Sequence, residues 1–142
     1  MTIYRFHLAF PVNDLEETRK FYINVLGCSL GRESEDWIDF NLYGNQIVAH
    51  LDKNKNEQIN KNSVDGDQIP SRHFGVILPR IEWEKLSKKI KKMRIPFLIK
   101  PRVRFKDKAG EQATFFINDP SGNALEFKSF EDESFIFKRS IR

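Results

Sequence analysis

The chain contains the same order of expected elements twice, and this repetition constrains its fold more than any other feature. Within residues 1–51, a strand that ends at a proline is followed by an amphipathic helix and three further strand-like runs, and residues 70–130 repeat that order. Residues 52–69 are rich in Asn and Lys and hold almost nothing apolar to bury, which predicts a linker. Residues 131–142 form a C-terminal tail. We therefore expect two tandem βαβββ modules.

A single module of this kind is too small to cover both faces of its own sheet. We therefore expect the two modules to pair into an α+β fold, with a curved sheet around a cavity and the helices outside. At roughly 100–200 residues per domain, residues 1–142 make a single domain. The sequence leaves open whether the modules pair within one chain or are exchanged between two chains.

The composition excludes several classes of protein. The single cysteine, Cys28, excludes a disulfide framework and fits a reducing cytoplasm. No apolar run approaches the roughly 18 residues of a membrane span, and the N-terminus lacks the basic region of a signal peptide. The net charge is +4, and the lysine-rich run at 85–92 has no interleaved aromatic residues for base stacking. We expect a cytoplasmic protein with no membrane or nucleic-acid partner.

Three histidines and one glutamate lie in strands that correspond between the modules. His7 and His73 are in the first strands, His50 is in the last strand of the first module, and Glu126 takes the matching place in the second. Strand alternation puts all four on the face opposite the apolar one. A lone histidine there is more often a satisfied core residue, but three of them beside a carboxylate favour a cation, which removes the cost of burying the charge. The pattern predicts a metal-containing cavity.

The same alternation predicts further residues that line this cavity. Arg5 is expected on the same face as His7. It could bind a carboxylate group of the substrate or orient a metal ligand through a hydrogen bond, and the sequence leaves both roles open. For residues 111–117 the inward face cannot be assigned from the pattern. We expect a small-molecule substrate, and an arginine in the cavity would suit an anionic one. The residues that we expect to contact it are Arg5, Trp37, Asp39, Asn41 and Gln46.

Over roughly residues 5–130 the sequence resembles the vicinal oxygen chelate superfamily, which includes glyoxalase I, extradiol dioxygenases and bleomycin-resistance proteins. Within it, the chain is most similar to a bacterial branch of predicted extradiol-type dioxygenases, although Asn45 stands where that branch often has a histidine. The resemblance implies a homodimer. The segments that carry it are 6–12, 21–22, 26–28, 37–40, 46–51, 64–66, 73–76, 104–106, 110–116 and 119–128.

The resemblance implies metal ligands at His7, His73 and Glu126, and the function then depends on His50. If His50 is an uncoordinated acid–base group, the three ligands match the facial triad of Fe(II) oxygenases. We then predict an extradiol-type dioxygenase that acts on a small aromatic diol or enediol with dioxygen. If His50 is a fourth ligand, as in glyoxalase-type members, a metal isomerase or lyase acting on a 2-oxo substrate is expected.

A third alternative is a metal-free small-molecule binding protein of the resistance type. Retention of the three ligand-type residues argues against it, since a sequestering pocket needs no metal ligands. We expect one divalent cation, with Fe(II) first and Mn, Ni, Zn or Co as alternatives.

Overall fold

The computed structural model of the protein describes residues 2–54 and 60–139. The chain divides into two compact units. Unit 1 consists of Met1–Gln58 together with Asp119–Asn123, and unit 2 consists of Ile59–Asn118 together with Ala124–Arg142. No helix in the part of the chain that the structure describes has both the length and the apolar character to cross a membrane.

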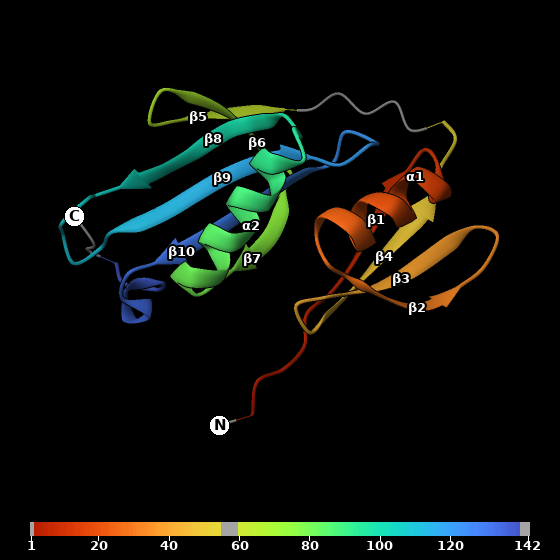
Figure 1. Ribbon diagram of the computed structural model, residues 1–142, viewed down its shortest axis with the longest axis horizontal. Coiled ribbons are helices and arrows are strands. Elements are labelled where there is room, and N and C mark those ends of the chain that lie inside the picture. The colour runs from red at the N-terminus through yellow and green to blue at the C-terminus, as the bar shows by residue number, and fades with distance from the viewer. Residues whose placement is uncertain (1, 55–59, 140–142) are drawn as a thin grey trace. The chain divides into compact units, whose positions relative to one another are not determined.

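Unit 1 contains a four-stranded sheet with a short helical segment on one face (Figure 1). The sheet has the order β1-β4-β3-β2, and β1 runs parallel to β4 while the other pairs are antiparallel. Its elements are β1 (His7–Val12), α1 (Leu15–Lys20), the π-helical η1 (Phe21–Val25), β2 (Ser29–Glu33), β3 (Trp37–Leu42) and β4 (Asn45–Leu51).

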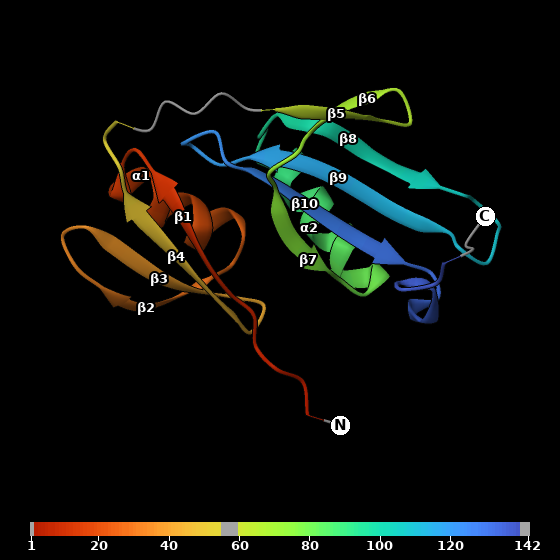
Figure 2. The ribbon, with the colours of Figure 1, turned by 180° about the vertical axis from the view of Figure 1, so that it is seen from behind.

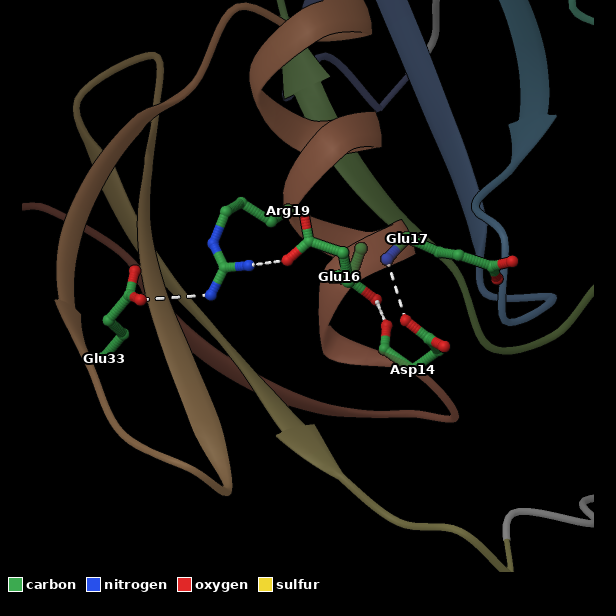
Figure 3. Close-up of polar contacts among 6 residues, drawn as sticks. Asp14, Glu16, Glu17, Arg19 and Glu33 are labelled. Carbon is green, nitrogen blue, oxygen red and sulfur yellow. Dashed lines mark hydrogen bonds and ion pairs between the residues drawn. The ribbon is translucent and has the colours of Figure 1, made fainter.

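The helix in unit 1 begins after a capping residue, Asp14. The Asp14 side chain accepts a hydrogen bond from the Glu17 backbone N–H at 2.8 Å, which caps the first turn (Figure 3). The helix continues as a π-helical turn and ends before Gly27, which has a φ of 73°. Glycine adopts this left-handed conformation without the steric cost that a Cβ brings, so it fits the end of the helix.

A buried polar network joins the segment 119–123 to the rest of unit 1. The Tyr22 hydroxyl donates to Asp119 Oδ2 at 2.8 Å, and both residues are buried. Burial and the adjacent carboxylate hold the pKa of Tyr22 well above its usual value, so the phenol stays protonated and donates. Asp119 Oδ1 also accepts from the backbone N–H groups of Ser121 and Asn123, and the Asn123 amide donates to Pro11 O at 2.8 Å.

Unit 2 repeats this arrangement and adds a hairpin (Figure 2). Its four-stranded sheet has the order β7-β10-β9-β8, and β7 is parallel to β10. Its elements are β5 (Lys61–Val64), β6 (Asp67–Pro70), β7 (Phe74–Ile77), α2 (Arg80–Lys92), β8 (Phe97–Arg104), β9 (Gln112–Asn118), β10 (Ala124–Phe130) and the 3₁₀ turn η2 (Glu133–Phe135). The two sheets with identical order confirm the expected pair of βαβββ modules.

One expectation needs correction. Residues 52–69 were expected to be a linker, but 61–64 and 67–70 pair as the antiparallel hairpin β5–β6. The turn at Asp65 and Gly66 has positive φ at both residues, which matches the twist of a two-residue hairpin.

The strand faces are those that alternation predicted. In unit 1, Tyr22 packs against Phe10 and stacks on Phe40, so this face of the sheet holds the helix. In unit 2, Phe115 lies against Trp83 of α2 and stacks on Phe127. The histidines of β1 and β4 and the glutamate of β10 are therefore on the faces opposite the helices.

Candidate metal centre

Unit 2 brings together two of the predicted ligands. His73 immediately precedes β7, and Glu126 lies in β10, which is the neighbouring strand. His73 Nε2 and Glu126 Oε1 are 3.3 Å apart, and both side chains are partly buried. Two electron-rich atoms in such contact need a positive charge between them, either a proton or a metal cation.

The other polar atoms of this pair are already engaged. His73 Nδ1–H donates to the Pro70 carbonyl oxygen at 2.7 Å, so the neutral ring has its lone pair on Nε2. Thr114 Oγ1 donates to Glu126 Oε2 at 2.5 Å, which leaves Oε1 toward the histidine. Outer hydrogen bonds of this kind orient metal ligands in proteins. Nε2 and Oε1 are therefore the atoms that this site offers to a cation.

Without a cation, the pair shares a proton. The hydrogen bond to Glu126 raises the pKa of His73, although burial alone would lower it. Burial alone would raise the pKa of Glu126, but the hydrogen bonds from His73 and Thr114 outweigh it and lower that pKa. The charged form of both residues is thus favoured in the folded protein.

The same pair fits a divalent cation. Two ligands of one ion each lie about 2.1 Å from it, and a separation of 3.3 Å between the donor atoms is compatible with that geometry. Imidazole and carboxylate ligands suit several divalent ions of the first transition row. A cation could therefore take the place of the shared proton and bind the same two atoms, His73 Nε2 and Glu126 Oε1.

Gly75 allows β7 and β10 to approach closely beside this pair. Gly75 lies opposite Glu126 in the register, and a Cβ built at Gly75 would be 1.6 Å from the backbone oxygen of Glu126. Any other residue at this position would therefore push the two strands apart. The glycine is part of how the fold sets the position of the carboxylate.

In unit 1, His7 is held in a similar way but at the surface. His7 Nδ1–H donates to Gln46 Oε1 at 2.8 Å, and the two residues are paired in the register of β1 and β4. Both side chains are exposed. His7 therefore presents Nε2 with its lone pair, as His73 does, and Gln46 serves to orient the ring.

The register places His50 away from His7. His50 lies opposite Pro11 and Trp37, four residues beyond Gln46 along β4, which is about 13 Å at the usual rise of a strand. That is far for two imidazoles on one ion, since each metal–nitrogen distance is about 2 Å. On the described structure, His50 is not placed to bind an ion together with His7.

The register also corrects the predicted match between His50 and Glu126. Glu126 is opposite Gly75, two residues after His73, and the residue opposite the second position after His7 is Val48. The counterpart of Glu126 in unit 1 is therefore the buried Val48 and not His50.

Trp37, Asp39 and Asn41 lie on the face of His7 but have local partners. Arg32 lies over the Trp37 ring, 5.6 Å from its centroid, and its Nε is 3.4 Å from Asp39 Oδ2. Asn41 Oδ1 accepts from the Gly44 backbone N–H at 2.6 Å and so stabilises the β3–β4 turn. Arg5 is exposed.

The structure thus gathers a pair and not a full ligand set. Within residues 2–54 and 60–139, no three or more His, Cys, Asp or Glu side chains come close enough to hold an ion. Sequence reasoning missed Thr114 and the Pro70 carbonyl, which act on the pair. The cross-strand pairing of Phe116 with Glu126 now shows that the even-numbered residues of β9 share the face of Glu126.

Comparison with known proteins supports the fold and the family. Residues 5–127 match the model of the Glyoxalase/Bleomycin resistance protein/Dioxygenase superfamily. The chain belongs to this superfamily. That membership confirms the resemblance found in the sequence.

Individual relatives are similar over most of their length. A glyoxalase/bleomycin resistance protein/dioxygenase from Alicyclobacillus acidocaldarius is 35% identical, with a TM-score of 0.79 over 94% of this chain and 96% of that one. The metallothiol transferase FosB of Lysinibacillus sphaericus (strain C3-41) is 26% identical over 85% of this chain and 78% of its own. The fosfomycin resistance protein FosX of Listeria monocytogenes, 17% identical with a TM-score of 0.69 over 96% of this chain and 100% of its own, shares the fold.

Proposed function

We propose that the chain is a metal-dependent enzyme that binds one divalent cation through His73, Glu126 and His7 and acts on a small molecule. The observation that carries this proposal is the facing pair of His73 Nε2 and Glu126 Oε1, 3.3 Å apart. Because Pro70 and Thr114 engage the other atoms of the pair, only these two atoms remain for a cation.

His7 is proposed as the third ligand because of the resemblance to the superfamily. Its hydrogen bond supports that role, since the Nδ1–H group donates to Gln46 and leaves Nε2 to bind. A set of two histidines and one carboxylate accepts Fe(II), Mn, Co, Ni or Zn. A bound cation would act as a Lewis acid toward an oxygen atom of the substrate.

The metal proposal is tested by cation binding to the wild type and to Glu126→Gln. Wild-type protein is expected to bind one divalent ion per chain. Glu126→Gln keeps the shape but removes the anionic ligand, so its affinity should fall by more than the roughly 10–100-fold that loss of an outer partner costs. The matched control is Glu84→Gln, at an exposed glutamate of α2. Wild-type protein that binds no cation after anaerobic loading with iron, zinc or manganese would leave the metal-free binding function instead.

Thiol transfer to a small electrophile is the first reaction to test. It is favoured by the similarity to a metallothiol transferase over most of both chains. Fosfomycin is a suitable probe because its phosphorus atom reports the reaction directly by NMR. We expect consumption of a thiol and a new phosphorus signal only with cation-loaded protein, and neither with Glu126→Gln.

Ring-cleaving dioxygenation is the second candidate. A three-ligand set suits it, and His50 lies four residues away from the partner of His7 in the register, which favours three ligands over four. Iron-loaded protein mixed with a panel of catechols should then consume dioxygen. Oxygen uptake equal to that of free iron would exclude this reaction.

Substrate contacts and self-association are proposed from the sequence and the resemblance. We propose that Trp37, on the face of His7, and Arg5, which lies just before β1, contact the substrate, and that the chain forms a homodimer. Sedimentation equilibrium measures the mass in solution. A mass of one chain at every concentration would contradict the dimer.

A further inference from the structure

The β5–β6 hairpin packs on the face of the unit 2 sheet that carries Glu126. Ile69 of β6 forms a buried cluster with Ile99 of β8 and Phe116 of β9. Phe116 is the cross-strand partner of Glu126, so the two side chains share one face. Figures 1 and 2 both show the hairpin beside β8. This hairpin, which the sequence predicted to be a linker, is therefore next to the candidate metal centre.

Two ion pairs fasten the hairpin to β8. Arg102 contacts the Asp67 carboxylate, and Arg104 Nε is 2.6 Å from Asp65 Oδ2. In the register of β8 and β9, Arg102 is opposite Thr114, which binds Glu126. These four charged residues form what we call the hairpin clamp. They are Asp65, Asp67, Arg102 and Arg104.

The far end of the hairpin holds the candidate ligand His73. Pro70 is the last residue of β6, and its carbonyl oxygen accepts from His73 Nδ1–H at 2.7 Å. The His73 ring also meets Phe116 edge to face, with 5.0 Å between the ring centroids. Phe116 in turn packs on Ile69. The ring of His73 is thus held by groups whose positions depend on the hairpin.

We propose that the hairpin clamp positions His73 and thereby selects the nitrogen that it presents. With the hairpin fastened to β8, the Pro70 carbonyl keeps the proton of the neutral ring on Nδ1 and leaves Nε2 toward Glu126. When the clamp is broken, the carbonyl moves and the proton distributes between both nitrogens. The consequence for cation affinity rests on the proposed function, whereas the consequence for the ring itself does not.

The first measurement uses metal-free protein in which Glu126→Ala removes the carboxylate that would otherwise compete with the Pro70 carbonyl for the ring proton. Long-range proton–nitrogen NMR correlations at alkaline pH report which nitrogen of the neutral His73 ring carries the proton. In this Glu126→Ala background, protein with the clamp intact should show Nδ1–H. The double variant Asp65→Asn/Asp67→Asn, which removes both carboxylates of the clamp, should show a mixture that includes Nε2–H. A variant that still shows only Nδ1–H while its ion pairs are gone would overturn the proposal.

The second measurement is the affinity for zinc, by competition with a chromophoric chelator. The double variant should bind zinc about 10-fold more weakly, the lower end of what loss of an outer partner costs. The matched control is Glu33→Gln, which removes an Arg19–Glu33 pair with a distance of 3.0 Å in unit 1 (Figure 3). The control should change neither the ring nor the affinity.

Two further variants separate positioning from stability. If the double variant unfolds, Asp65→Asn alone removes the more exposed of the two carboxylates and allows the same NMR measurement. In the same background, the reversed pair Asp67→Arg/Arg102→Asp should keep the Nδ1–H form that the intact clamp gives. Thermal destabilisation with an unchanged His73 ring would make the clamp merely structural and refute its positioning role. If neither the wild type nor any variant binds zinc, the metal proposal fails. The NMR result still decides the role of the clamp in that case.

Discussion

The two units have the same sheet order, yet their histidines differ in burial and in hydrogen-bond partner. His73 of unit 2 is half-buried and donates to a backbone carbonyl, whereas His7 of unit 1 is exposed and donates to the side chain of Gln46. Two residues after each histidine, the opposite strand carries Glu126 in unit 2 and Val48 in unit 1. The duplicated module has therefore kept its architecture, while only one copy holds a complete donor pair.

A second difference is the distance between the two parallel strands of each sheet, β1 and β4 in unit 1 and β7 and β10 in unit 2. Unit 2 has Gly75 opposite Glu126, where a Cβ would be 1.6 Å from the backbone oxygen, but unit 1 has Ala9 opposite Val48 and accommodates its Cβ. The strands of unit 2 are thus drawn together at the donor pair. The comparison indicates that unit 2 is shaped around this pair and that unit 1 is not.

The largest effect is expected for Gly75→Ala. Because the added Cβ would collide with the backbone oxygen of Glu126, the strands must separate, and we expect the free energy of unfolding to fall by about 3 kcal/mol or more. The cation affinity should fall as well, since Glu126 moves with its strand. Ala9→Gly in unit 1 is the control and should cost about 1 kcal/mol, through backbone entropy alone. Urea unfolding and zinc competition measure both quantities, and equal effects of the two variants would contradict the difference between the units.

The next effect in size concerns the buried polar network of unit 1. Tyr22→Phe removes a hydrogen bond to the buried Asp119 carboxylate, and we expect a loss of about 2 kcal/mol in the free energy of unfolding. Asp119 keeps its bonds from Ser121 and Asn123, which limits the loss. Thermal and urea unfolding of the two proteins give the difference. If Tyr22→Phe is as stable as the wild type, the hydrogen bond between Tyr22 and Asp119 contributes nothing to the free energy of unfolding.

A smaller effect is the pH dependence of the metal-free donor pair. His73 has a raised pKa, so its contribution is full below the unfolded value of 6.5 and is lost as the pH rises through the folded pKa. Glu126 has a lowered pKa, so its contribution is present above 4.5 and is lost as the pH falls through the folded pKa. The stability difference between wild type and Glu126→Gln should therefore be greatest between pH 4.5 and 6.5. A difference that is constant with pH would exclude the shared proton.

The sequence predicted the element order, the strand faces and the ligand candidates because each follows from local periodicity. It did not predict the register, since alternation assigns His50 to a face but does not fix its position along the strand. It missed the hairpin because β5 consists of Lys61, Asn62, Ser63 and Val64, without an apolar alternation, and is exposed. It missed Thr114 because β9 is buried on both faces at residues 112–117, so no polar face marks it.

The smallest effect contrasts two fully buried hydroxyl groups, one in each unit. In unit 1, Thr18 Oγ1 donates to the Asp14 backbone oxygen at 2.6 Å, whereas Ser129 Oγ of unit 2 has no hydrogen-bond partner in the described part of the chain. An unpaired buried hydroxyl costs free energy, so Ser129→Ala should raise the free energy of unfolding by about 0.5 kcal/mol. Thr18→Val, which keeps the volume but loses the bond, should lower it by about 1 kcal/mol. Urea unfolding measures both changes. If both variants lose stability equally, Ser129 has a partner that satisfies it, and the two units do not differ in this respect.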